Sequence, residues 1–172
     1  MIFTAYANGL LDFGDRAARC ALGRAGVIAA GGKREGDGCS PAGGWPMRRL
    51  LYRRDRGPAP ATRLPSVAIA PHDGWCDDPA DDAYNRPVGL PYPASAEALW
   101  REDGLYDVIV VLGHNDAPVV PGAGSAIFLH VAAPGYAPTE GCVALARADL
   151  DVLLARAGPD DALAISFDRR ES

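Results

Sequence analysis

The chain has 172 residues, of which 48% are hydrophobic and 23% are charged, a balance typical of a soluble globular protein. This length suits one hydrophobic core, so we expect a single domain over residues 1–172. The net charge of −5 argues against a nucleic-acid-binding protein, because phosphate backbones are bound by basic surfaces.

The first thirty residues predict short strands. Residues 2–6 and 10–13 are apolar and β-prone, and Asn8-Gly9 between them is the favoured dipeptide of a tight hairpin turn. Two further short strands are predicted at 19–22 and 26–30. Polar residues interrupt the apolar ones early, unlike a secretory signal, and no stretch approaches the ~20 apolar residues of a membrane helix. We therefore expect a cytoplasmic protein without a membrane partner, or a periplasmic one if a leader precedes this sequence.

The middle of the chain predicts fewer regular elements. The Gly-rich residues 31–44 predict a loop, and 45–52 predict a strand that enters a solvated basic stretch. Between residues 56 and 93 prolines recur too often for long helices or central strands, but the aromatic residues favour an ordered excursion packed over the domain. Residues 95–102 predict a short helix with Ser95 as its N-cap.

The last third predicts core strands and a second helix. Residues 107–113 and 125–132 are continuous apolar runs, typical of buried strands. Leucines at helical spacing predict a helix over 148–157, which Gly158-Pro159 ends. A last strand is predicted at 161–167. Together these patterns predict a mainly β fold with a few short helices.

The four cysteines form no CxxC pair, so the spacing of a metal site is absent. In a reducing compartment they remain free thiols, and we interpret Cys20, Cys39 and Cys76 as structural. The aspartates between 77 and 82 lack the glycine and terminal glutamate of a calcium-binding loop. We therefore expect no metal and no other cofactor.

Cys142 and His130 are the candidates for chemistry. Cys142 follows Gly141 at the end of a loop, and His130 lies in an apolar strand. Each alone has a plainer interpretation, as a buried thiol and a core histidine. Together they predict a nucleophile and its general base, because a neighbouring imidazole converts a thiol into the reactive thiolate. Gly141 permits a sharp turn whose backbone N–H groups can hold an oxyanion.

Residues 127–145, IFLHVAAPGYAPTEGCVAL, resemble the signature of the L,D-transpeptidase (YkuD-type) catalytic domain family. That signature has a histidine on a strand, then a loop, then Ser/Thr-x-Gly-Cys. By this resemblance His130 matches the family's general base, Thr139 its Ser/Thr, and Gly141-Cys142 its glycine and nucleophile. The resemblance implies an L,D-transpeptidase-like β-sandwich catalytic domain.

The resemblance extends over roughly residues 20–167, because residues 36–43 are similar to the family's upstream GDGxTPxG segment. Two positions depart from the family pattern. Glu140 stands where the family usually has the histidine of SHGC, and Ala144 stands where Arg or Asn usually follows. These departures fit a branch with altered handling of the acyl acceptor.

Six residues are candidates for substrate binding. They are Tyr84, Asn85, Arg86, His114, Thr139 and Glu140. His114 follows the end of a strand, and the resemblance implies that a histidine in this neighbourhood lines the cleft. Arg86 could clamp a substrate carboxylate, or pair with Asp81 or Asp82. Glu140 could orient His130 or face solvent.

The resemblance also implies the reaction: attack of the cysteine on the bond between the L-centre of the third stem-peptide residue and D-alanine, through a thioester. Because no export signal is seen, we predict an L,D-carboxypeptidase that trims murein tetrapeptide in peptidoglycan recycling. The alternatives are an L,D-transpeptidase that forms crosslinks or exchanges D-amino acids, and a non-catalytic muropeptide-binding module. The partner expected in every case is a murein stem peptide, and the oligomeric state stays open.

Overall fold

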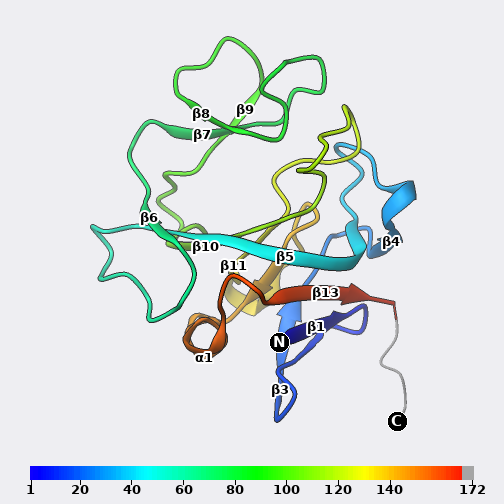
Figure 1. Ribbon diagram of the computed structural model, residues 1–172, viewed down its shortest axis with the longest axis vertical. Helices are drawn as coiled ribbons and strands as arrows, with labels where there is room; N and C mark the ends of the chain where they lie inside the picture. Colours follow the sequence, from blue (N-terminus) through cyan, green and yellow to red (C-terminus); the bar gives the residue numbers. More distant parts are fainter. Residues whose placement is uncertain (168–172) are drawn as a thin grey trace.

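The larger sheet of the protein closes on itself (Figure 1). The computed structural model describes residues 1–167. Its closed ring consists of β1 (Ile2–Tyr6), β2 (Leu10–Asp12), β3 (Ala17–Ala21), β5 (Ser40–Tyr52), β10 (Val108–Leu112), β11 (Phe128–Val131), β12 (Val143–Leu145) and β13 (Ala162–Ser166). They pair in the order β10–β11–β12–β3–β2–β1–β13–β5, and β5 pairs back with β10. The fold is therefore mainly β, as predicted.

The long strand β5 is what closes the ring. Its first half pairs with β13, and its second half pairs with β10, both antiparallel. Two short strands, β4 (Val27–Ala29) and β6 (Ser66–Ala68), pair with β5 in parallel outside the ring. The described residues also form one α-helix, α1 (Arg147–Arg156), and two 3-10 turns, η1 (Ala30–Gly32) and η2 (Pro134–Tyr136).

The main core is built from residues that alternate along the ring strands, as expected for sheets with one buried face. Phe3, Leu11, Leu129 and Leu163 are among its fully buried members. The helix α1 contributes the predicted leucines, which join the same cluster. These are Leu150, Leu153 and Leu154. Burial of a leucine side chain stabilises the fold by about 1.5–3 kcal/mol.

A small antiparallel sheet stands over β5 and β10 (Figure 1). It is formed by β8 (Pro87–Gly89), β7 (Asp73–Cys76) and β9 (Ala96–Ala98), so the proline-rich excursion is ordered, as predicted. A second apolar cluster lies between it and the ring, including Trp75, Tyr106, Phe128 and Cys142. The small sheet thus covers the face of the ring on which Cys142 lies.

Most predicted elements are confirmed, but the helix at 95–102 is wrong. Residues 96–98 form β9 instead, paired with β7, and the Leu99 N–H donates to Asp73 O at 2.9 Å. The pairing partner lies some twenty residues earlier, where no local pattern could indicate it, and tertiary pairing overrides helix propensity.

Two predicted boundaries also shift. The loop predicted over 31–44 ends at Cys39, because β5 already begins at Ser40 and pairs there with β4. The strand predicted over 125–132 begins only at Phe128, because Ala126 has a left-handed φ of 51°. That irregular residue lies beside the candidate nucleophile.

Candidate active site

His130 and Cys142 lie on the same face of two paired strands. In the parallel pair β11–β12, His130 lies opposite Ala144, and Cys142 comes two residues before Ala144. Residues two apart in an extended chain point to the same face. Both side chains line one pocket of about 580 Å³ between these strands and the small sheet.

The turn before Cys142 depends on Gly141. Its φ is 137°, in the region that favours glycine, and a Cβ there would lie 2.8 Å from the carbonyl oxygen of Cys39. The Thr139 hydroxyl donates to Cys142 O at 2.6 Å and accepts from Gly141 N–H at 3.1 Å. Since Gly141 N–H is already engaged by Thr139, its place in the structure is conformational, and this N–H is not free to hold an oxyanion.

The Cys142 thiol is buried and hydrogen-bonded to backbone. Cys142 is 8% exposed. The Sγ–H donates to Ala126 O at 3.2 Å, and Phe128 N–H donates to Sγ at 3.4 Å. Burial, and after it the charge of Glu97, raise the pKa of this thiol to about 12, against the hydrogen bond from Phe128. At rest the group is therefore a thiol.

His130 is held as a neutral imidazole. Its Nδ1 lies 2.8 Å from Val131 O, and because a carbonyl only accepts, Nδ1 carries the hydrogen and Nε2 is the basic nitrogen. Burial lowers the pKa of His130 to about 4, against the hydrogen bond to Val131. The ring packs edge-to-face on Tyr106, with centroids 5.2 Å apart. The resting pair is thus a thiol and a neutral imidazole, not an ion pair.

The pocket has an acidic lining. Its charged members are Glu35, Asp77, Glu97, Arg101 and Glu140. Tyr106 donates its hydroxyl to Glu97 at 2.5 Å, and burial raises the pKa of Glu97. Sequence reasoning missed Glu97 and Arg101, because residues 95–102 predict a helix, and it missed Tyr106 in the segment that follows. Their only sequence signal is a place just before the buried strand at 107–113.

Two of the six predicted substrate-binding residues line this pocket, Thr139 and Glu140. The Glu140 side chain is 76% exposed, and its carboxylate accepts from Arg24 Nε at 2.9 and 3.0 Å. Glu140 therefore forms a surface ion pair at the rim of the pocket. Thr139, by contrast, ties the turn around Gly141 and Cys142.

Tyr84 and Asn85 are buried supports of the segment before β11. The Tyr84 hydroxyl donates to Glu35 at 2.5 Å and accepts from Gly124 N–H. Burial raises the pKa of Tyr84, so the phenol stays neutral. Asn85 accepts from Ala126 N–H at 3.0 Å and donates to His114 O and to Asn115 O. Asn85 thus holds Ala126, whose carbonyl accepts the Cys142 thiol.

His114 and Arg86 are not among the residues that line the Cys142 pocket. His114 is buried with its ring edge-to-face on Trp45, at 4.8 Å between centroids, and burial lowers its pKa to about 4. Arg86 donates to Asp116 O at 3.2 Å, whereas Asp81 accepts from Tyr92. Arg86 lines a second pocket, next to β5.

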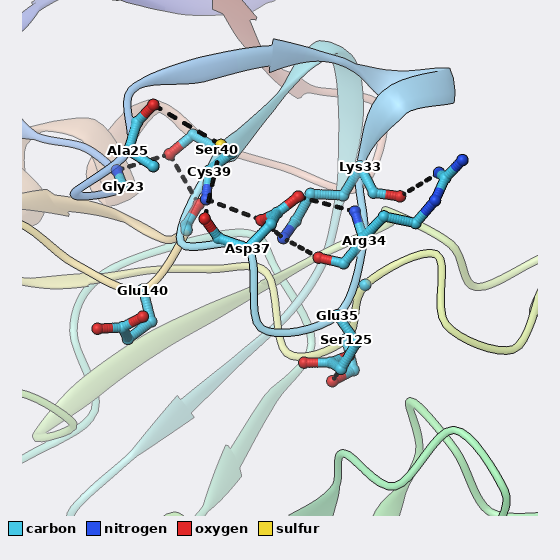
Figure 2. Close-up of polar contacts among 12 residues, drawn as sticks. Gly23, Ala25, Lys33, Arg34, Glu35, Asp37, Cys39, Ser40, Ser125 and Glu140 are labelled. Atoms are coloured by element: carbon cyan, nitrogen blue, oxygen red, sulfur yellow. Dashed lines mark hydrogen bonds and ion pairs between the residues drawn. The ribbon is translucent and has the colours of Figure 1, made fainter.

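The Gly-rich loop between η1 and β5 is held by a set of polar contacts (Figure 2) and leads to Ser40, which contacts the turn before Cys142. Lys33 is 2% exposed, and its ammonium donates to Asp37 at 2.5 Å. Asp37 also accepts from Cys39 N–H and Arg34 N–H. In this loop, the Glu35 carboxylate accepts a hydrogen bond from the Ser125 hydroxyl at 2.7 Å. Just after the loop, the Ser40 hydroxyl donates to the carbonyl oxygen of Gly141.

All four cysteines are free thiols. In residues 1–167 no group of three or more His, Cys, Asp or Glu side chains is placed to hold a metal ion. No helix of that same described part is long and apolar enough to cross a membrane.

Comparison with known proteins gives one match. The model of the YkuD family, described as the L,D-transpeptidase catalytic domain, matches residues 2–165, nearly the whole chain. No curated protein and no solved structure matches.

Proposed function

Because the chain belongs to the L,D-transpeptidase (YkuD) catalytic domain family, we propose that Cys142 and His130 carry out acyl transfer on a peptidoglycan stem peptide. Members of the family are generally cysteine-dependent enzymes that act on peptidoglycan. One observation carries the proposal: a buried thiol and a neutral imidazole line the same pocket of about 580 Å³. That combination is the one needed by a nucleophile with a general base.

In the proposed reaction, Cys142 Sγ attacks the carbonyl before the terminal D-alanine while His130 Nε2 takes the thiol proton. The C–S bond forms and the C–N bond breaks, and the imidazolium returns its proton to the departing amine. A thioester remains. Water then attacks its carbonyl, His130 takes the water proton, and the C–S bond breaks to restore the thiol.

Proton transfer has to accompany the attack. With a thiol pKa of about 12, a fraction on the order of 10⁻⁵ is thiolate at neutral pH. A preformed thiolate would also lie near Glu97, which opposes its charge. A neutral His130, with its Nε2 lone pair available, is the form that can accept the proton during the step.

We propose hydrolysis as the outcome, which makes the enzyme an L,D-carboxypeptidase of murein tetrapeptide. A pocket of about 580 Å³ lies in the range that holds one ligand of drug-like size, ~300–1,000 Å³. A pocket of this size holds one short peptide and a water molecule. It does not also hold a second peptide strand as the acyl acceptor. Glu140, at the position that departs from the family pattern, is paired with Arg24.

One observation favours transpeptidation as a second candidate. Four carboxylate side chains line the pocket against the single guanidinium of Arg101. An acidic lining attracts an ammonium group, and the acceptor of an L,D-transpeptidase is an amine. A small D-amino acid could enter where a crosslinking peptide could not.

The experiment that separates these candidates is incubation of the protein with murein tetrapeptide, with and without a D-amino acid. Mass spectrometry should find tripeptide and free D-alanine, and no new amide product. A new tetrapeptide ending in the added D-amino acid would instead establish exchange. Cys142→Ala should abolish either reaction, whereas Cys39→Ala, a half-buried cysteine beside the same turn, should retain it. If Cys142→Ala and the unaltered protein both bind tetrapeptide and neither converts it, the chain is a binding module.

A further inference from the structure

A second pocket lies between the small sheet and the β5–β10 pair, apart from the turn that carries the candidate nucleophile. Its volume is about 360 Å³. Arg48 and Arg49 reach it from β5, Trp75 from β7, and Arg86 from the segment before β8. Figure 1 shows the two layers that enclose it, the small sheet above and the β5–β10 pair below. His130, Thr139, Gly141 and Cys142 are not among the residues that line this pocket.

The charges around this second pocket do not balance. Asp116 is the only acid among its lining residues, against three guanidinium groups. Arg48 donates two hydrogen bonds to the Asp116 carboxylate, at 2.8 and 3.2 Å. Arg86 donates to the backbone carbonyl oxygen of Asp116. One carboxylate thus offsets one arginine, and the pocket keeps an excess of positive charge.

Of the three arginines, only Arg48 forms an ion pair among the described residues, and Arg49 is the one that also has an unpaired buried donor. Its Nε is buried and makes no hydrogen bond among the described residues. Its guanidinium carbon lies 5.9 Å from the centre of the Trp75 ring, an orientation that a cation–π contact also stabilises. A buried donor without an acceptor is unfavourable, and a bound oxyanion would supply the missing acceptor.

We propose that this pocket, which we call the arginine pocket (Arg48, Arg49, Arg86, Trp75 and Asp116), binds the carboxylate of a small ligand of amino-acid or dipeptide size. The planar fork of Arg49 matches a carboxylate with two parallel hydrogen bonds, and Arg86 closes the other side. The apolar walls, formed by Val111, Leu112 and Ile127, suit the ligand's aliphatic part.

The arginine pocket is separate from the Cys142 pocket, so the proposal does not rest on the proposed function. Ile127 is the one residue that lines both. Asn85 and Phe128 line the arginine pocket alone, and Phe128 N–H is the donor to Cys142 Sγ. A ligand in the arginine pocket would therefore touch the strand that positions the thiol without reaching the thiol itself.

Trp75 provides the reporter for the test, because it lines the arginine pocket and its indole Nε1–H donates to Asn85 at 3.0 Å. We would titrate the full chain with N-acetyl-D-alanine and follow the indole ¹⁵N–¹H signals, assigning that of Trp75 with Trp75→Phe. N-acetyl-D-alanine amide is the uncharged match, and inorganic phosphate tests for a general oxyanion site. The expected result is a saturable shift with the carboxylate only.

Variants decide which groups bind the probe. Arg49→Gln and Arg86→Gln should each weaken binding about tenfold or more, the loss expected for a charged hydrogen-bonding partner. Arg54→Gln removes an exposed arginine beyond the end of β5 and should change nothing. Cys142→Ala should also leave the affinity unchanged. Since Arg86 is exposed, its variant tests the site even if Arg49→Gln fails to fold.

Three results would overturn the proposal. A shift of the indole signal by the amide at the same concentrations as the acid would leave no role for the carboxylate. A loss of binding in Arg54→Gln equal to that in Arg49→Gln would indicate a diffuse charge effect. Tighter binding of phosphate than of N-acetyl-D-alanine would make the pocket a site for tetrahedral oxyanions.

Discussion

Ser40 donates its hydroxyl hydrogen to the carbonyl oxygen of Gly141 at 2.8 Å, a contact between residues 101 positions apart in the chain. The same hydroxyl accepts from Gly23 N–H at 2.9 Å, and Ser40 is fully buried. One side chain thus joins the start of β5, the turn after β3 and the turn that carries Cys142.

Replacing Ser40 with alanine should therefore loosen the turn at Cys142. Two buried backbone groups lose their partner, which costs about 1–3 kcal/mol of unfolding free energy. Turnover of murein tetrapeptide should fall by more than the fraction of unfolded protein explains. Denaturant titration and kcat/KM measure the two effects. Ser66→Ala, a change at an exposed serine, is the control and should change neither the unfolding free energy nor kcat/KM. Equal losses of both quantities in the two variants would contradict the expectation.

Gly141→Ala should be much more damaging than Gly135→Ala in the same loop. Both glycines have positive φ, 137° and 74°, where a Cβ costs about 1–2 kcal/mol. Only at Gly141 would the Cβ meet a backbone atom, Cys39 O at 2.8 Å, whereas nothing lies within 4 Å at Gly135. The difference in unfolding free energy between the two variants isolates this clash. Similar stabilities of the two variants would mean that the backbone at Cys39 shifts away from the added Cβ at little cost.

Alkylation of Cys142 should rise steadily with pH. Iodoacetamide reacts with the thiolate, and burial raises the pKa of this thiol to about 12, so the rate should increase about tenfold per pH unit from pH 6 to 9. Turnover should instead be flat across that range and fall as pH drops toward 4, where His130 becomes protonated. Alkylation that levels off near neutral pH would reveal a preformed ion pair.

Glu97→Gln should make the thiol more acidic. After burial, the charge of Glu97 is the next cause that raises the pKa of Cys142, and glutamine keeps an oxygen for the Tyr106 hydroxyl. We expect faster alkylation at pH 8 than in the unaltered protein. Glu140→Gln removes an exposed carboxylate that pairs with Arg24 at the pocket rim, and should have no such effect. Equal rates in all three proteins would exclude an electrostatic role of Glu97.

His114 should make the protein less stable in mild acid. Burial lowers its pKa from 6.5 to about 4. Between about pH 6.5 and 4, the unfolded chain therefore binds a proton at this histidine that the folded chain does not bind. The stability from this group is present above pH 6.5 and is lost as pH falls toward 4. In His114→Gln the slope of unfolding free energy against pH should decrease by up to about 1.4 kcal/mol per unit in this window. His72→Gln, at an exposed histidine, should keep the full slope.

Local patterns predicted much of this molecule. The Asn8-Gly9 hairpin, the apolar runs that became β10 and β11, and the leucine spacing of α1 are determined within a few neighbouring residues, and each is confirmed. The family is likewise predicted from a short stretch, residues 127–145, and the family match over 2–165 confirms it. Residue type and spacing suffice where structure and chemistry are local.

Only the tertiary structure decided what surrounds Cys142. Residues 96–98 form a strand because β7 offers an edge, and that strand brings Glu97 into the pocket. Tyr84 and Asn85 became buried supports, and Arg86 turned to a different pocket, because the excursion folds back over β5 and β10. The sequence by itself determined the nucleophile and base as candidates. Burial and long-range pairing, which no local pattern encodes, decided their protonation states and their neighbours.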